Sequence, residues 1–161
     1  MSGEFPEHVS HELPPDVRAA VVAARFNEPI VSRLLTSCLG RLGELGIDAA
    51  RVEVHRVPGA FELPLAAQSL ARTGRFRAVI CLGCVVRGET PHFDYVAAEA
   101  ARGIARVALD ERLPVIFGVL TTKTLEQAQA RSGGRHGDAG RRAAEAAVEM
   151  AAMMRAVGPA L

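Results

Sequence analysis

The most constraining feature of the chain is the run from Ala78 to Tyr95, AVICLGCVVRGETPHFDY, in which a continuous apolar segment leads directly into a helix start. The part up to Val86 is short and rich in β-branched side chains, which is typical of a strand buried on both faces of a parallel sheet. Thr90 and Pro91 then suit the N-cap and the first helical position. The run therefore predicts an α/β fold in which helices cover both faces of this strand.

The junction between this strand and the helix is also the strongest candidate site. Gly88 permits a ligand to approach the backbone closely, and the free N–H groups of a helix N-terminus bind phosphate. His92 lies in the first helical turn, faces the same ligand and is a candidate for proton transfer. A capped helix that merely carries a histidine is the alternative interpretation, and the spacing alone leaves both open.

Apolar strands and amphipathic helices alternate along the rest of the chain. Strands are predicted at about residues 17–24, 51–57, 78–86 and 113–121, and helices at about residues 29–45, 62–73, 91–109, 124–131 and 138–157. Four strands that alternate with helices predict one parallel sheet covered on both faces. Residues 17–161 are expected to form this single domain, and residues 1–16 an extended arm on a neighbouring subunit, with a disordered tail as the alternative.

Composition argues against several classes of function. The formal net charge of the 161 residues is +1, so we expect no nucleic-acid partner. No apolar run has the length of a membrane span and residues 1–16 do not resemble a signal peptide, so a cytoplasmic protein without a membrane partner is expected. Cys81 and Cys84 spell C-x-x-C, but residues three apart in a strand point to opposite faces. We therefore expect no redox pair, no metal site and no cofactor.

Aromatic and polar residues follow the predicted strands. Because the carboxyl ends of parallel strands open on one side of the sheet, residues 26–27, 59–62, 84–92 and 117–123 are expected to share one rim. Phe26 and Phe61 offer flat surfaces to a planar ring, and Glu62 can accept hydrogen bonds from hydroxyl groups or amines. Core packing for the phenylalanines and a helix-dipole role for Glu62 are the alternatives. Lys123 is the only lysine, so a Schiff base on the protein would depend on it.

Four segments carry a resemblance to a known family: RFNEPI at 25–30, VPGAFELP at 57–64, GCVVRGETPHFDYVAAE at 83–99 and PVIFGVLTTKTLEQAQARSGG at 114–134. They resemble the 6,7-dimethyl-8-ribityllumazine synthases of riboflavin biosynthesis, in the family's order and over about residues 17–156. The resemblance implies a flavodoxin-like three-layer αβα sandwich with a four-stranded parallel sheet. It also implies a condensation of 5-amino-6-(D-ribitylamino)uracil with 3,4-dihydroxy-2-butanone 4-phosphate to give 6,7-dimethyl-8-ribityllumazine, phosphate and water, the penultimate step of that pathway.

The resemblance implies a role for each matching residue. Contacts with the pyrimidine substrate would come from Phe26, Ala60, Phe61, Glu62, Cys84, Val85, Val86 and, across a subunit boundary, Phe117. Contacts with the butanone phosphate would come from Gly88, Glu89, Thr90 and Arg131. His92 would be the catalytic proton-transfer residue. Where the family commonly reads G-N-K-G, this chain has an alanine in place of the lysine at position 139, and Arg135 or Arg141 would have to replace that basic contact.

The resemblance also implies a homo-oligomer. A pentamer is expected, and in this family a short link between the last two helices is associated with the closure of twelve pentamers into a 60-subunit icosahedral shell. The link Ser132–Gly137 is short, which favours the shell. The partners expected are the small-molecule substrates and, as a further candidate, riboflavin synthase.

Two other functions remain open. A non-catalytic flavin- or lumazine-binding shell protein would account for the missing lysine, and a phosphosugar aldolase or isomerase would use Lys123. The joint presence of Glu62, Thr90, His92 and Arg131 favours the synthase, because a protein that only binds its ligand needs no proton-transfer residue.

Overall fold

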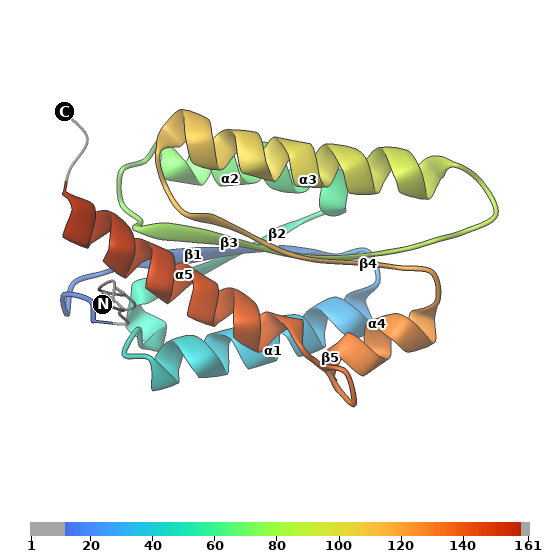
Figure 1. Ribbon diagram of the computed structural model, residues 1–161, viewed down its shortest axis with the longest axis horizontal. Helices are drawn as coiled ribbons and strands as arrows, with labels where there is room; N and C mark the ends of the chain where they lie inside the picture. The colour runs from blue at the N-terminus through green and yellow to red at the C-terminus, as the bar shows by residue number, and fades with distance from the viewer. Residues whose placement is uncertain (1–11, 159–161) are drawn as a thin grey trace, which may run out of the picture.

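Four parallel strands form the middle layer of the molecule (Figure 1). They are β1 (Ala19–Ala24), β2 (Val52–Val57), β3 (Ala78–Val86) and β4 (Val115–Thr122), and they lie in the order β2-β1-β3-β4. The computed structural model describes residues 12–158. Its all-parallel sheet confirms the predicted α/β fold.

Helices cover both faces of this sheet (Figure 1). One face packs against α1 (Glu28–Glu44) and α5 (Ala139–Val157), and the other packs against α2 (Leu63–Ala71) and α3 (His92–Glu111). A shorter helix, α4 (Leu125–Arg131), follows β4. Cys84 belongs to the apolar cluster beneath α1 and α5, whereas Cys81 belongs to the cluster beneath α2 and α3. The two thiols therefore point to opposite faces, as predicted.

The two central strands are buried and set the positions of the others. Every residue of β1 is buried, as are those of β3 up to Val85, which explains their nearly continuous apolar sequences. The edge strand β2 is only partly buried and carries charged residues that face solvent. Two 3₁₀ turns, η1 (Ala49–Arg51) and η2 (Ala60–Glu62), lie on either side of β2.

The link before α5 has more structure than the sequence predicts. Two very short antiparallel strands, β5 (Ser132–Gly134) and β6 (Gly137–Asp138), form a hairpin there. Gly133 and Gly137 have φ angles of +93° and +99°, which side chains rarely tolerate, and this accounts for the glycines. Asp138 then caps α5, because its Oδ1 accepts a hydrogen bond of 3.1 Å from the backbone N–H of Arg141.

Only the end of the predicted N-terminal arm lies within the described residues. Leu13 packs against the apolar cluster beneath α1 and α5 of its own chain, and Arg51 donates a hydrogen bond to the carbonyl of Pro15. Residues 1–11 lie outside the described part, so the docking of the arm on a neighbour stays a prediction. No helix in residues 12–158 has the length and apolar character that crossing a membrane requires.

Candidate active site

Strand β3 extends past its neighbour β1 at the carboxyl end of the sheet. The pairing with β1 stops at Ala23 and Leu82, whereas β3 continues beside β4 as far as Val86. Beyond β1 the chain turns at Asn27, a left-handed residue with φ 57° and ψ 44°, whose side-chain amide donates a 2.8 Å hydrogen bond to the carbonyl of Cys84. Backbone groups alternate in direction along a strand, so those of Val86 point to the same side as those of Cys84. The end of β3 is thus an open backbone edge.

A cavity of about 720 Å³ lies beside this edge, within the size range of small-molecule sites. Three chain segments and one aromatic ring surround it: the turn after β2, the end of β3 with its loop, the first turns of α3, and Phe26. Its lining consists of Phe26, Pro58, Gly59, Ala60, Phe61, Glu62, Cys84, Val85, Val86, Gly88, Thr90, His92, Phe93, Tyr95 and Val96. The fold therefore brings together ten of the thirteen site residues predicted from the sequence.

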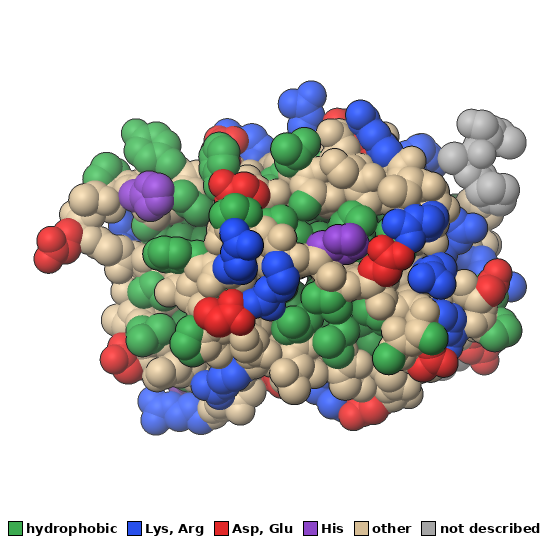
Figure 2. Space-filling view, turned by 180° about the vertical axis from the view of Figure 1, so that it is seen from behind, with side chains coloured by type: hydrophobic (Ala, Val, Ile, Leu, Met, Phe, Trp, Pro, Cys, Tyr) green, Lys and Arg blue, Asp and Glu red, His purple; other side chains and the backbone are tan. Residues whose placement is uncertain are grey.

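Three aromatic side chains stand exposed around the cavity. Phe26 is 72% exposed, Tyr95 70% and Phe61 58%, which is unusual for rings of this size. Hydrophobic side chains gather at the left-hand end of Figure 2. Because that view is turned by 180°, this is the right-hand end of Figure 1, where the loop before α3 lies. Exposed apolar surface next to polar groups is typical of a ligand or partner site.

Glu62 closes the turn after β2 and still faces the cavity. Its Oε2 accepts a 2.9 Å hydrogen bond from the backbone N–H of Gly59, which fixes the carboxylate. Its Oε1 makes no hydrogen bond with the residues that the structure describes. One oxygen of the carboxylate is therefore free of hydrogen bonds within the described residues and is available to a ligand hydroxyl or amine.

Arg87 stabilises the loop before α3. Its backbone N–H donates a 2.9 Å hydrogen bond to the carbonyl of Thr122, which prolongs the β3–β4 pairing. Its guanidinium lies 4.6 Å from the centre of the Phe93 ring and forms a 3.0 Å ion pair with Asp94. These contacts hold the first turn of α3 against the end of the sheet. The Arg87 guanidinium thereby stabilises the position of the Phe93 ring, which lines the cavity.

The helix carries His92 at its first position. The predicted start at Pro91 with Thr90 as N-cap is wrong by one residue, because Pro91 is the N-cap and Thr90 accepts only a long 3.4 Å hydrogen bond from the N–H of His92. Tyr95 and Val96 follow at the three- and four-residue spacing that places side chains on one helix face. That spacing was the signal for these two cavity residues, which the sequence analysis missed.

The thiol of Cys84 is part of the cavity lining without being a nucleophile. Burial raises its pKa to about 11, so it stays protonated at neutral pH. Burial also raises the pKa of Cys38 and of Cys81, each to about 12. Among residues 12–158, no three histidine, cysteine or acidic side chains come together in a way that could hold a metal ion.

Comparison with known proteins decides the family. Residues 16–155 match the family profile described as 6,7-dimethyl-8-ribityllumazine synthase. The chain belongs to the 6,7-dimethyl-8-ribityllumazine synthase family. Curated proteins of that name include one from Salinibacter ruber, 52% identical over 151 residues that cover 93% of this chain and 97% of the relative. The one from Syntrophus aciditrophicus is 50% identical over 141 residues, covering 88% and 92%, and the one from Protochlamydia amoebophila is 51% identical over 133 residues, covering 83% and 77%.

Lumazine synthases are transferases of riboflavin biosynthesis, so the chain is an enzyme of that class. Three of the residues that the family resemblance singled out do not line the cavity of the single chain. Glu89 is exposed in the loop before α3, and Arg131, at the end of α4, donates a 3.0 Å hydrogen bond to the carbonyl of Gln127. Phe117 pairs with Cys81 in the middle of β4, so its expected place at the strand-end rim is wrong. Lys123 does not line the cavity either.

The departure from the lumazine synthase pattern has a structural counterpart. Arg141, one proposed replacement for the missing lysine, pairs with Glu44 at 3.2 Å and with Glu145 at 3.7 Å, so it links α5 to α1. Its guanidinium is therefore engaged away from the cavity. This leaves Arg135 as the replacement that forms no ion pair among the residues described.

Proposed function

We propose that this enzyme condenses 5-amino-6-(D-ribitylamino)uracil with 3,4-dihydroxy-2-butanone 4-phosphate to form 6,7-dimethyl-8-ribityllumazine, one phosphate and two water molecules. The observation that carries the proposal is the single cavity in which exposed aromatic rings, a carboxylate oxygen, an open strand edge and His92 meet. A planar, polar pyrimidine and a small phosphate ester together require this combination of groups.

The pyrimidine would bind between the aromatic rings and the end of β3. Phe26 would stack on its ring, with Phe61 and Tyr95 shielding it from water. The backbone groups of Val86 would bind the polar edge of the ring, because β1 has ended and leaves them without a strand partner. The Oε1 atom of Glu62 would accept a hydrogen bond from the ribityl chain or an amine.

The phosphate ester would bind at the start of α3. Gly88 has open space where a side chain would be, and the first N–H groups of the helix favour an anion. Glu89 and Thr90 would complete this loop, and Arg131 would supply the countercharge. The two nitrogen atoms that form new bonds both belong to the pyrimidine, so the protein need not supply a nucleophile. His92 would move the protons that accompany loss of water and phosphate.

The test is to mix the purified protein with both substrates and follow lumazine absorbance and phosphate release together. We expect one phosphate per lumazine, at a rate well above the uncatalysed mixture, and no signal when either substrate is omitted. Tight lumazine binding with no acceleration would instead favour the non-catalytic shell protein. A substrate adduct on Lys123 trapped by borohydride would favour the aldolase.

A further inference from the structure

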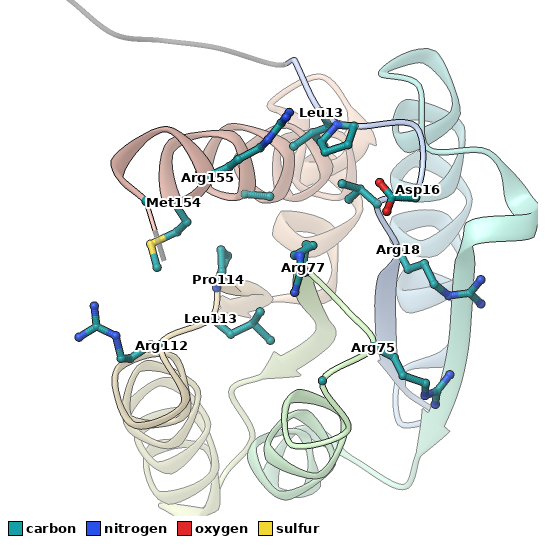
Figure 3. Close-up of a pocket in the computed structure, with 15 residues that line it drawn as sticks. Leu13, Asp16, Arg18, Arg75, Arg77, Arg112, Leu113, Pro114, Met154 and Arg155 are labelled. Atoms are coloured by element: carbon teal, nitrogen blue, oxygen red, sulfur yellow. The ribbon is translucent and has the colours of Figure 1, made fainter. Parts of the chain in front are cut away.

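A second cavity, of about 570 Å³, lies at the other end of the sheet. Figure 3 shows it among the segments that lead into β1, β3 and β4 and the last turn of α5. It therefore opens at the amino ends of the strands, whereas the candidate active site opens at their carboxyl ends. Nothing in the proposed reaction uses this cavity.

The wall of this cavity concentrates positive charge, so we call it the arginine cavity. Five arginines and one acid, Asp16, line it, although the whole chain has 19 basic and 18 acidic residues. The arginines are Arg18, Arg75, Arg77, Arg112 and Arg155. They come from four separate segments, so the fold, and not a run of basic sequence, brings them together (Figure 3).

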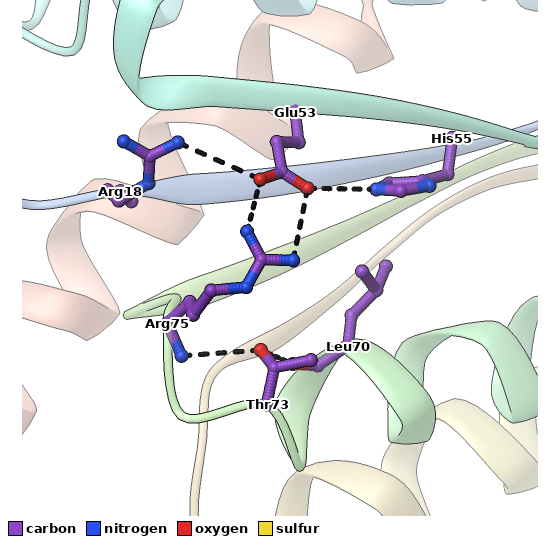
Figure 4. A network of polar contacts seen from close by, with 6 residues as sticks. All are labelled: Arg18, Glu53, His55, Leu70, Thr73 and Arg75. Carbon is purple, nitrogen blue, oxygen red and sulfur yellow. Dashed lines mark hydrogen bonds and ion pairs between the residues drawn. The ribbon is translucent and has the colours of Figure 1, made fainter.

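Two of the five arginines are held by one carboxylate (Figure 4). Glu53 forms an ion pair of 3.7 Å with Arg18 and a closer pair with Arg75, and its other oxygen lies 3.2 Å from Nε2 of His55. The hydrogen bond from Arg75 is the main cause that lowers the pKa of Glu53. This network fixes one wall of the arginine cavity and neutralises part of its charge.

The other three arginines carry charge that no acidic side chain of the described residues neutralises. Arg77, Arg112 and Arg155 form no ion pair among residues 12–158. Arg77 lies near the middle of the opening in Figure 3, with Arg112 and Arg155 on different sides of it. Arg112 has left-handed backbone angles, φ 51° and ψ 46°, at the position after α3 where glycine is usual. The fold therefore tolerates backbone strain where this guanidinium lies.

Apolar side chains lie between these charges. Leu113 and Pro114 lie between Arg112 and Arg77 in Figure 3, and Val17 and Met154 also line the cavity. A purely inorganic anion would leave this apolar surface unused, whereas an anion with a ring or hydrocarbon body would cover it.

We propose that the arginine cavity binds a small organic anion that carries two or more phosphate groups on an apolar or ring-containing body. Arginine forks bind phosphate oxygens in pairs, and three unpaired guanidinium groups require more than one phosphate to neutralise them. The volume suits a molecule of nucleotide size.

The test is calorimetric titration of the full-length protein with ATP and, separately, with tripolyphosphate, at about 0.15 M ionic strength. We expect saturable binding of one ATP per chain, weaker binding of tripolyphosphate, and at least about tenfold weaker ATP binding in the Arg77→Gln/Arg112→Gln double variant. The Arg102→Gln/Arg106→Gln variant removes the same charge from the exposed face of α3 and should bind ATP like the parent protein. An equal loss of ATP affinity in both double variants, or no ATP binding by the parent protein, would overturn the proposal.

A second experiment distinguishes binding at this cavity from binding at the candidate active site. ATP binding should survive Arg131→Ala, and its loss there with retention in the Arg77→Gln/Arg112→Gln variant would assign the anion to the active site and overturn the proposal. Phenylglyoxal labelling of the unaltered protein gives a readout that needs no variant. ATP should protect Arg77, Arg112 and Arg155 but not Arg102, and uniform labelling would contradict the site. Because no lumazine substrates are present, these results do not depend on the proposed reaction.

Discussion

At the scale of single residues, the candidate active site depends on groups that the local fold leaves free to interact with a ligand. Glu62 has one oxygen left after closing its turn, Val86 has the backbone groups that β1 does not reach, and His92 has a ring at the first position of α3. The local fold is already satisfied without a ligand, since no buried polar side-chain atom in the described residues is without a partner. Changes at these residues should therefore affect turnover more than folding.

Replacing His92 with alanine should slow turnover by roughly 10 to 10⁴ fold, because general acid–base groups contribute up to about that factor. Pyrimidine binding should change little, since the aromatic rings remain. Steady-state rates and a pyrimidine titration measure the two effects separately. An unchanged kcat would remove His92 from the mechanism.

Replacing Arg131 with alanine should raise KM for the butanone phosphate about ten- to hundredfold, because a charge-assisted hydrogen bond to phosphate contributes about 1.5–3 kcal/mol. Among residues 12–158 the only polar partner of this side chain is the carbonyl of Gln127 in its own helix, so thermal stability should change little. The matched variant Arg131→Lys keeps the charge and should recover part of the affinity. Equal increases in KM for both substrates would show that the residue is structural.

The three thiols should be inert at neutral pH. Burial raises the pKa of Cys84 to about 11, against 9.0 for an unhindered thiol, so a thiol reagent at pH 8 should label the native protein only slowly and the unfolded protein fully. A raised pKa gives stability that is present below pH 9 and is lost as the pH rises towards 11, by up to about 1.4 kcal/mol per pH unit. Between pH 8 and pH 10 the Tm should therefore fall less in Cys84→Ser than in the parent protein. The variant should keep full activity.

At the scale of helices and strands, α1 and α5 approach each other closely at one glycine. A Cβ atom on Gly140 would lie 2.2 Å from the carbonyl oxygen of Leu34, which neither backbone can relieve without moving. Gly140→Ala should cost about 1–3 kcal/mol and lower Tm by about 2–12 °C. Gly40→Ala, in the interior of α1 where nothing beyond its own helix backbone and chain neighbours lies within 4 Å of the Cβ position, should instead stabilise by about 0.5–1 kcal/mol. Equal losses of Tm in the two variants would rule out the close approach as the cause.

The elements that the sequence predicts best are those with a strong burial pattern. Strand β3 was predicted with its observed bounds, Ala78–Val86, because a strand covered on both faces leaves an uninterrupted apolar run. Helix ends depend on one or two hydrogen bonds, which is why the start of α3 was misplaced by a residue. The β5–β6 hairpin was missed because strands of two or three residues carry no periodicity.

The candidate site was predictable where it lies at strand ends of one chain. Topology alone places Phe26, Glu62 and His92 on one side of a parallel sheet, and the cavity contains all three. Phe117 was misplaced because residues 117–123 were all assigned to the strand-end rim, whereas the register puts Phe117 opposite Cys81 in the middle of β4. The arginine cavity was not predictable, since its arginines come from separate segments and show no common motif.

At the scale of the whole molecule, the single chain leaves apolar surface uncovered. Phe117 is 43% exposed on the edge strand β4, and other large apolar side chains are exposed along the helices: Leu65, Leu109, Leu125 and Val157. Isolated exposed residues are ordinary, but a half-exposed phenylalanine in the middle of a strand favours a partner that covers it. The family resemblance predicts that this partner is a second copy of the chain.

We expect the chain to be inactive as a monomer, to form pentamers, and to close twelve of them into a 60-subunit shell. Phe117 is absent from the cavity of its own chain, so the predicted contact with the pyrimidine has to come from a neighbour. The short link that favours the shell is folded into the β5–β6 hairpin, which two glycines with positive φ and the Asp138 cap hold compact. Light scattering in dilute neutral buffer measures the mass directly: a fully active particle of five chains would exclude the shell, and an active monomer would exclude the shared site. Phe117→Ala should dissociate the assembly and abolish turnover together, because one side chain would serve both the subunit contact and the pyrimidine pocket.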